Sequence, residues 1–279
     1  MTPDRADGPL DPRDDARSVG HSPSGAIYTE TDHAVMSIVL NRPEKRNALS
    51  LAMWQSLTEL AHRASAADDV RALVVRSSTP VAFSAGADIS EFKDTRSNPV
   101  DGALYNQAVA DAETALATCP KPTVAIVRGF AIGGGSVVAM ACDFRVGDES
   151  AEFGIPASKL GIVYPPVSIE RLADVVGTQT ARRMLLAGQR PKGAEAYRLG
   201  LLDFLSPSDE VVERGIALAR ELSEASAFAY ASIKEIFEHM LLHRIGPEAH
   251  RRYREVEHGT YELDEYQGNV ARFTPPVAQ

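Results

Sequence analysis

Two glycine-containing loops hold the residues of this chain whose types and spacing could do chemistry. The tripeptide Gly133 to Gly135 lies between an apolar segment and a run of small residues, and the stretch SAGADI at 84–89 lies upstream. Backbone N–H groups at a glycine-rich turn into a helix are unpaired donors, and the positive end of the helix dipole strengthens their attraction for negative charge. A carbonyl oxygen that becomes an enolate or alkoxide suits such donors, so the loops predict an oxyanion-binding site.

Other patterns of catalytic residues are weak or missing. His239 and His243 stand four residues apart on a predicted helix, but no H-E-x-x-H motif occurs, so we predict no metal site. The glycine run does not fit the dinucleotide pattern G-x-G-x-x-G, and neither the P-loop motif nor G-x-S-x-G is found. Backbone donors are therefore the expected chemistry, without a metal.

Composition limits the class of protein. With 279 residues, 44% of them hydrophobic, the chain can bury one large core with a smaller appendage. A formal net charge of -9 argues against nucleic acid as a partner. The two cysteines, Cys119 and Cys142, form no C-x-x-C pair, and no apolar run is long enough for a membrane span. We therefore expect a cytoplasmic protein that binds neither nucleic acid nor membrane.

The first part of the chain changes character near residue 26. Residues 1–25 are rich in Asp, Pro, Gly and Ser, which predicts a disordered leader. Residues 26–31 and 34–41 then alternate like a strand hairpin, Ser50 caps a predicted helix, and residues 71–76 form an apolar strand. The order strand, helix, strand begins an α/β domain.

The order of elements continues in the same way around the glycine run. A helix is expected over 102–117, a strand over 123–127, a helix over 136–141 and a strand over 143–146. Alternating strands and helices favour stacked βα layers, with their loops gathered at one end. The two glycine-containing loops are expected at that end.

Beyond Leu205 the chain is expected to be helical, over residues 209–224, 227–243 and 247–258. One face of the second helix is apolar, formed by Ile233, Ile236, Phe237, Met240 and Leu241. Such a face needs a cover, which is either the protein's own core or a neighbouring subunit. The pattern does not choose between them.

Four segments in order and spacing resemble a known family: NRPEKRNALS at 41–50, FSAGADI at 83–89, GFAIGGGSVVAMACDFRVG at 129–147 and FGIPASKLG at 153–161. They are similar to motifs of the crotonase (enoyl-CoA hydratase/isomerase) superfamily, over roughly residues 26–270. The resemblance implies a crotonase-like spiral of ββα turns over 26–205. It also implies a C-terminal helical oligomerisation region over 206–279, in a homotrimer or a dimer of trimers.

The resemblance also implies the ligand, an acyl-CoA thioester of the kind used in fatty acid metabolism. By motif position, the backbone N–H groups of Ala87 and Gly134 would form the oxyanion hole for the thioester carbonyl. Coenzyme A would enter as part of the substrate, with no permanently bound cofactor. The residues expected along its path are Lys45, Arg46, Ala48, Ala85, Asp88 and Ile89, with the two cations near its phosphates.

The chain departs from the family pattern where hydratases carry two glutamates. These positions hold Val137 and Ala157. Hydration needs a base for water and an acid for the α-carbon, each contributing about 10²- to 10⁴-fold to the rate, and neither side chain can move a proton. Hydratase activity is therefore expected to be weak or absent.

Tyr164, in a loop followed by two prolines, is a candidate replacement, although a tyrosine is a poor base unless its pKa is lowered. The other interpretation is that it packs along the ligand channel. Glu170 is the first acid after the second loop, and a place on a helix surface is expected for it.

Two functions remain open. One is an enzyme, a lyase or isomerase, that stabilises an enolate of an acyl-CoA. The alternative is a non-catalytic fatty acyl-CoA binding or carrier protein, since both acid/base positions are apolar.

Overall fold

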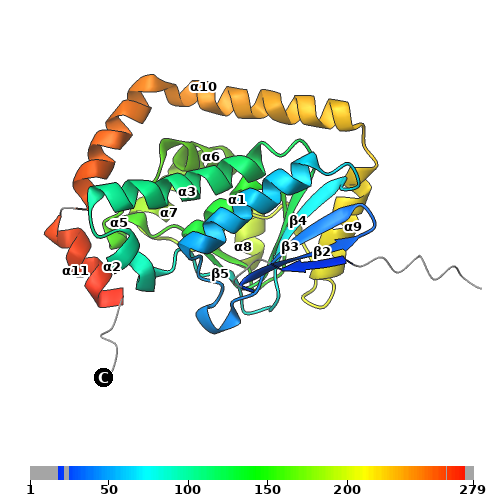
Figure 1. Ribbon diagram of the computed structural model, residues 1–279, viewed down its shortest axis with the longest axis horizontal. Coiled ribbons are helices and arrows are strands. Elements are labelled where there is room, and N and C mark those ends of the chain that lie inside the picture. The colour runs from blue at the N-terminus through cyan, green and yellow to red at the C-terminus, as the bar shows by residue number, and fades with distance from the viewer. Residues whose placement is uncertain (1–17, 22–24, 262, 274–279) are drawn as a thin grey trace, which may run out of the picture.

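Two β-sheets form the centre of the computed structural model, and helices pack around them (Figure 1). The structure describes residues 18–21, 25–261 and 263–273. The larger sheet has the order β1-β2-β3-β4-β6-β8-β10, with bounds β1 Ser18–His21, β2 Ile27–Asp32, β3 Val35–Leu40, β4 Ala72–Ser77, β6 Thr123–Val127, β8 Phe144–Gly147 and β10 Phe204–Leu205. The smaller sheet has the order β5-β7-β9, with bounds β5 Ala82–Ser84, β7 Phe130–Ile132 and β9 Glu152–Gly154.

The larger sheet begins antiparallel and continues parallel. Strands β1, β2 and β3 pair antiparallel, and β3, β4, β6, β8 and β10 pair parallel. Every residue of β3 and of β6 is buried, which is typical of parallel strands covered on both faces. The hairpin and the strands expected around 71–76, 123–127 and 143–146 are confirmed.

The smaller sheet places the functional loops. Its three strands are parallel, so their carboxyl ends meet at one edge. The SAGADI loop leaves this edge from β5, the glycine turn leaves it from β7, and the loop that contains Ala157 leaves it from β9. Ligands commonly bind at the carboxyl ends of parallel strands, and three segments far apart in the sequence come together here.

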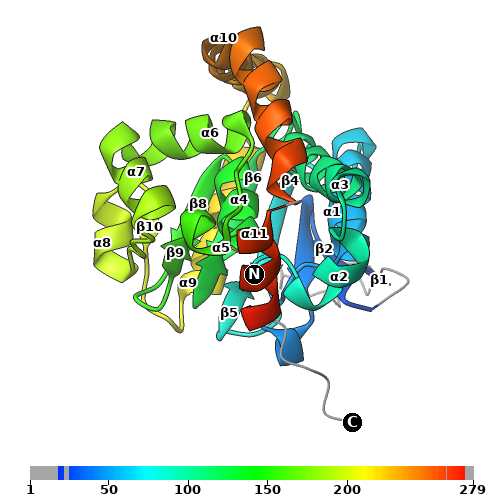
Figure 2. The ribbon, with the colours of Figure 1, turned by 90° about the vertical axis from the view of Figure 1, so that its left-hand side faces the viewer.

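The helices lie on both faces of the larger sheet and beyond its end (Figure 2). Their bounds are α1 Leu51–Ala66, α2 Phe92–Thr95, α3 Pro99–Ala117, α4 Gly134–Ala141, α5 Ala157–Leu160, α6 Pro166–Val176, α7 Thr178–Leu186, α8 Gly193–Arg198, α9 Val211–Ser223, α10 Ala227–Thr260 and α11 Asp264–Phe273, with 3₁₀ turns η2 Pro43–Lys45 and η3 Ile89–Glu91. Ser50 caps α1 as expected, its hydroxyl oxygen accepting from the Met53 N–H at 3.2 Å. Helix α9 covers the sheet face opposite α1 and α3, packing Val211 and Leu218 on β4 and β6.

The N-terminal prediction needs one correction. Residues 18–21 were assigned to a disordered leader, but they form β1 and pair with β2, Val19 lying opposite Glu30. Backbone pairing to an available sheet edge orders a segment that has little hydrophobic character of its own. The remainder of the expected leader, residues 1–17 and 22–24, lies outside the described residues.

The C-terminal region is helical, as expected, with two differences. The predicted helices 227–243 and 247–258 are two segments of α10 that meet at a break at Gly246, whose φ is 66°. Helix α11 was not predicted, and it packs Tyr266 and Val270 beside Phe92. Of the expected apolar face on α10, Leu241 is buried against the core, and the others are more than half exposed: Ile233, Ile236, Phe237 and Met240.

No helix among the described residues is both long enough and apolar enough to cross a lipid bilayer.

Candidate functional site

The two glycine-containing loops abut at the edge of the smaller sheet. A Cβ atom on Gly86, whose φ is +94°, would lie 2.6 Å from the Ile132 carbonyl oxygen and 3.3 Å from the Gly134 nitrogen. Only glycine lets the backbones approach this closely. The turn before α4 also needs glycine, because Gly133 has a φ of +54°. The close contact between the two loops thus explains why both of them contain glycine.

The N–H groups of Ala87 and Gly134 donate no backbone hydrogen bond within the described part of the chain. Their neighbours do: the Asp88 N–H bonds to the Leu49 carbonyl at 2.9 Å, and the Gly133 N–H to the Gly154 carbonyl at 2.7 Å. Gly134 is also the first residue of α4, where the helix dipole favours negative charge. The two amides are therefore available to an acceptor that enters from outside the chain.

A cavity of about 90 Å³ opens beside these amides. Most of its lining is apolar, and no carboxylate, imidazole or thiol group occurs among the described residues that line it. The lining includes Trp54, Ala85, Gly86, Ala87, Ile89, Phe92, Arg96, Val109, Gly133, Gly134, Val137, Pro156, Tyr164, Ser168 and Tyr253. The cavity combines backbone donors with an apolar wall, as a site for an acyl group would.

The two positions without glutamate differ in their surroundings. Val137 lies on the first turn of α4, lines the cavity and is 1% exposed. Ala157 begins α5 and is also buried, but its neighbour Pro156, rather than Ala157 itself, lines the cavity. Neither position supplies a polar atom to the cavity beyond the backbone.

Tyr164 lines the cavity beside the glycine turn, and its hydroxyl oxygen would lie 3.2 Å from a Cβ atom built on Gly133. Burial raises the pKa of Tyr164 to about 12, and the charge of Arg96 only partly opposes that rise. At neutral pH the phenol is therefore protonated. It can donate a hydrogen bond to a ligand but cannot serve as a base.

The residues expected along the coenzyme A path divide into two groups. Ala85 and Ile89 line the cavity, whereas Lys45 and Arg46 are exposed outside it and Ala48 is buried away from its lining. The Arg46 guanidinium lies 5.9 Å from the centre of the Phe130 ring.

Asp88 belongs to neither group, because its carboxylate is occupied within the protein. It accepts a hydrogen bond from the Ser90 N–H at 3.0 Å and forms an ion pair with the Arg42 guanidinium at 2.7 Å. Burial favours the protonated acid, but the hydrogen bonds from Ser90 and the interaction with Arg42 together outweigh it and lower the pKa of Asp88. The side chain holds the SAGADI loop in place, which its motif position alone did not indicate.

The comparisons with known proteins bear directly on these loops. The family model described as enoyl-CoA hydratase/isomerase matches residues 30–274, which include both glycine-containing loops and the C-terminal helices. The chain belongs to the enoyl-CoA hydratase/isomerase family. The crotonase resemblance and the α/β fold with a C-terminal helical region are thereby confirmed, and the relatives named enoyl-CoA hydratase support the expectation that the protein is an enzyme of this family.

Individual relatives of this family agree. The "probable enoyl-CoA hydratase" of Mycobacterium bovis is 35% identical over 217 residues, covering 75% of this chain and 79% of its own length. A family member from Hyphomonas neptunium has a TM-score of 0.74 at 31% identity, covering 89% of this chain and 94% of that one. The structure of an enoyl-CoA hydratase/carnithine racemase from Magnetospirillum magneticum has a TM-score of 0.74 at 28% identity. The match covers 77% of this chain and 80% of that one.

Arg96 is a cavity residue that the sequence did not single out. It follows α2, lines the cavity and is 6% exposed, with its guanidinium 4.6 Å from the Phe92 ring centre and 4.1 Å from that of Tyr105. One terminal nitrogen donates to the Asn106 side-chain oxygen at 2.9 Å, but Nε is buried and has no hydrogen-bond partner in the part of the chain that the structure describes. Nothing in the local pattern around residue 96 indicates burial.

Energetics make this arginine unusual. A cation–π contact contributes roughly 0.5 to 2 kcal/mol, whereas taking an unpaired ion out of water costs on the order of several kcal/mol. Within the described ranges no carboxylate lies within 4.0 Å of the guanidinium. The aromatic rings and one amide therefore leave part of the cost of burying Arg96 uncompensated.

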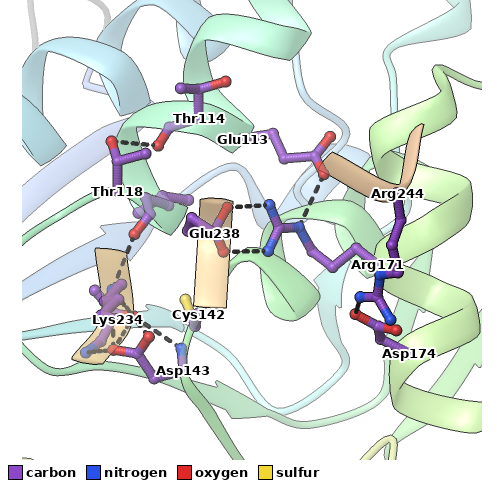
Figure 3. A network of polar contacts seen from close by, with 12 residues as sticks. Glu113, Thr114, Thr118, Cys142, Asp143, Arg171, Asp174, Lys234, Glu238 and Arg244 are labelled. Atoms are coloured by element: carbon purple, nitrogen blue, oxygen red, sulfur yellow. Dashed lines mark hydrogen bonds and ion pairs between the residues drawn. The ribbon is translucent and has the colours of Figure 1, made fainter. Parts of the chain in front are cut away.

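Glu113 is a second residue that the sequence did not indicate. It lies on α3 and is almost fully buried, and its carboxylate accepts a hydrogen bond from the Ser168 hydroxyl at 2.6 Å, on the wall of the cavity. Arg171 donates to Glu113 at 3.2 Å and forms a paired contact with Glu238 of α10 at 2.8 and 2.9 Å (Figure 3). Burial raises the pKa of Glu113 despite the opposing charge of Arg171.

Helix α10 contributes to the cavity wall from the C-terminal region. Tyr253 of α10 lines the cavity, and its hydroxyl is buried without a hydrogen-bond partner among the described residues. Tyr261 packs its ring against Gly102, where a Cβ atom would lie 2.4 Å from the ring. The second segment of α10 therefore forms part of the wall of the site.

Proposed function

We propose that this protein binds an acyl-CoA thioester and polarises its carbonyl between the N–H groups of Ala87 and Gly134. The single observation that carries the proposal is that these two amides have no backbone partner among the described residues while their neighbours are bonded, beside an apolar cavity. Charge that develops on the carbonyl oxygen as an enolate forms would be stabilised by fixed donors, which need no reorganisation during the reaction. Family membership supports the choice of thioester.

The reaction class is a lyase or isomerase reaction through an enolate, with hydration of an enoyl-CoA weak or absent. A lyase reaction that forms the enolate by breaking a C–C bond, with CO₂ as the leaving group, needs no side chain to take a proton. An isomerase reaction would need a base, which the described cavity lining does not hold. Val137 and Ala157 supply neither acid nor base. Tyr164, protonated because its pKa is raised to about 12, would act as a hydrogen-bond donor to the bound acyl group.

Coenzyme A would be held as part of the substrate, without a resident cofactor. Lys45 and Arg46 are exposed, and we propose that they meet its phosphates, while Ala48, Ala85, Asp88 and Ile89 shape the path of the pantetheine backbone. The double variant Lys45→Ala with Arg46→Ala is then expected to weaken binding of a CoA thioester. Binding of the matching pantetheine thioester, which lacks the nucleotide, is expected to stay the same.

A substrate screen tests the proposed activity. Purified protein is incubated with 2-enoyl, 3-enoyl, β-keto and malonyl-type CoA esters, and conversion is followed by chromatography. Turnover of at least one ester above the protein-free rate is expected. The absence of turnover with all of them would reject the catalytic proposal.

The second candidate is a non-catalytic fatty acyl-CoA carrier, and the observation that favours it is the absence of acid/base side chains from the described cavity lining. Micromolar binding of a long acyl-CoA without conversion would favour the carrier. Failure to bind any acyl-CoA would reject both candidates.

We further propose a cytoplasmic homotrimer or dimer of trimers. Ile236, Phe237 and Met240 of α10 are 58%, 65% and 57% exposed in the single chain, and a neighbouring copy would cover them. Both cysteines are free and buried, as in a reducing compartment. Light scattering of the wild type and of Phe237→Glu tests the assembly, since a charge on this face is expected to dissociate it.

A further inference from the structure

The cavity beside the oxyanion loops contains donors that lack an acceptor. Arg96 is 6% exposed, yet its Nε has no hydrogen-bond partner among the described residues. The hydroxyl of Tyr253, on the same cavity wall, is buried and also lacks a partner. Buried polar groups are nearly always paired, so two unpaired donors lining one cavity point to a ligand that supplies acceptor atoms.

The surroundings of Arg96 indicate that the ligand carries a negative charge. Its guanidinium is always charged, and its contacts include the Phe92 and Tyr105 rings, the neutral Asn106 amide and the neutral Tyr266 hydroxyl, none of which carries a negative charge. Glu257 is connected only indirectly, because its carboxylate accepts from the Asn106 side-chain nitrogen at 2.5 Å. Asn106 is thereby oriented with its oxygen toward Arg96. The cation is thus held in position, and no described residue forms an ion pair with it.

The place of this cation relative to the oxyanion loops indicates which part of a ligand would meet it. Trp54 packs against Gly134, where a Cβ atom would lie 2.6 Å from the indole. The indole N–H donates to the Tyr105 hydroxyl at 3.0 Å, and the Tyr105 ring then packs against Arg96. An indole and a phenol therefore link the carbonyl-binding turn to the guanidinium. The charge would meet the far end of an acyl group rather than the carbon next to its thioester carbonyl.

We infer that the acyl group bound by this protein ends in a free carboxylate, which Arg96 and Tyr253 hold. The ligand class is the mono-CoA thioester of a short dicarboxylic acid. This inference rests on the proposed acyl-CoA function and specifies its substrate. A carboxylate offers acceptors only, and it supplies the negative charge that the guanidinium lacks, by hydrogen bonds that are strengthened by charge.

Calorimetric binding of two matched thioesters tests the inference. Glutaryl-CoA and pentanoyl-CoA have the same number of acyl carbons and differ in a terminal carboxylate or methyl group. The wild type is expected to bind glutaryl-CoA at least about tenfold more tightly. Malonyl-CoA, whose carboxylate is attached to the carbon next to the thioester carbonyl, is expected to bind more weakly than glutaryl-CoA.

Variants then assign the preference to residues. Arg96→Met is expected to lose the preference for glutaryl-CoA, and Arg96→Lys to keep part of it. Tyr253→Phe removes only a hydroxyl. It is therefore expected to weaken the binding of glutaryl-CoA several-fold and to leave the binding of pentanoyl-CoA unchanged. If the Arg96 variants do not fold, the binding of the two thioesters to the wild type and to Tyr253→Phe still tests whether the bound acyl group ends in a carboxylate.

The outcomes separate this inference from the proposed function. Pentanoyl-CoA bound as tightly as glutaryl-CoA by the wild type would overturn the dicarboxylic substrate and leave the acyl-CoA function intact. A preference for glutaryl-CoA that survives Arg96→Met would overturn the role of Arg96. Failure of all three thioesters to bind would overturn the proposed function and this inference with it.

Discussion

The Ser168 hydroxyl on the cavity wall donates a hydrogen bond of 2.6 Å to the carboxylate of Glu113 behind it. Arg171 connects that carboxylate to Glu238, so α3, α6 and α10 meet at one guanidinium (Figure 3). The same helices carry residues of the cavity wall, including Val109, Ser168 and Tyr253. Disturbance of this buried network is therefore expected to affect both stability and the shape of the site.

Replacing the shared cation tests its contribution to stability. Arg171→Met leaves two carboxylates without their partner, so a loss of about 3 to 5 kcal/mol in the free energy of unfolding is expected. Urea titration measures it. The matched control is Arg244→Met, because Arg244 pairs with Asp174 at the surface and such pairs contribute about 1 kcal/mol or less. Equal losses in the two variants would contradict the prediction.

The raised pKa of Glu113 predicts a pH dependence of stability. The ordinary pKa of a glutamate, 4.5, applies to the unfolded chain, and burial raises the pKa of Glu113 in the folded state. At a pH between the unfolded-state pKa and the folded-state pKa, the folded protein therefore binds more protons than the unfolded chain. The free energy of unfolding therefore falls as the pH rises through this window, by at most about 1.4 kcal/mol per pH unit.

Glu113→Gln removes this titration, and its unfolding free energy is expected to vary less steeply with pH. The measurement is urea unfolding of both proteins at several pH values from about 4.5 upward. Ser168→Ala keeps the carboxylate and removes a hydrogen bond that lowers its pKa, so its unfolding free energy is expected to fall with pH over at least as wide a range as in the wild type. Parallel profiles for the wild type and Glu113→Gln would contradict a raised pKa.

Restoring the missing carboxylates tests whether they limit hydration. The double variant Val137→Glu with Ala157→Glu is expected to raise crotonyl-CoA hydration by about 10²-fold or more, because each group can then move a proton. The control is Val137→Gln with Ala157→Gln, because glutamine has nearly the size of glutamate but no acidic group. This control is expected to show no gain in hydration. If the glutamate variant folds without any gain, the cavity itself has a shape unsuited to hydration.

The contact between Gly134 and Trp54 predicts a specific intolerance. In Gly134→Ala the new Cβ atom would lie 2.6 Å from the indole, which must shift and thereby alter the cavity wall. A stability loss of about 1 to 3 kcal/mol and weaker acyl-CoA binding are expected. Gly268→Ala on α11 is the control. A Cβ atom there has no described atom within 4 Å, and alanine is more favourable than glycine in a helix by about 1 kcal/mol. Thermal unfolding and calorimetry compare the two variants.

Local pattern was sufficient for most of the elements near the oxyanion loops. The apolar spacing of α1 and its cap Ser50 are properties of neighbouring residues, and both were predicted correctly. Residues 18–21 could not be predicted, because their order comes from pairing with β2. The side chain of Asp88 was assigned to the coenzyme A path from its motif position, yet only the fold brings Arg42 against its carboxylate.

The sequence by itself determined the family, the α/β order of elements and the two glycine-containing loops, because these depend on short motifs, hydrophobic period and local backbone freedom. It also showed that Val137 and Ala157 carry no acid or base. Only the tertiary structure decided that Arg96 is buried at the cavity with no carboxylate of the described residues beside it, and that Glu113 lies behind Ser168, 55 residues away in the chain. The physical reason is that the partners of a buried charge come from distant segments, so its need for a ligand is a property of the folded chain alone.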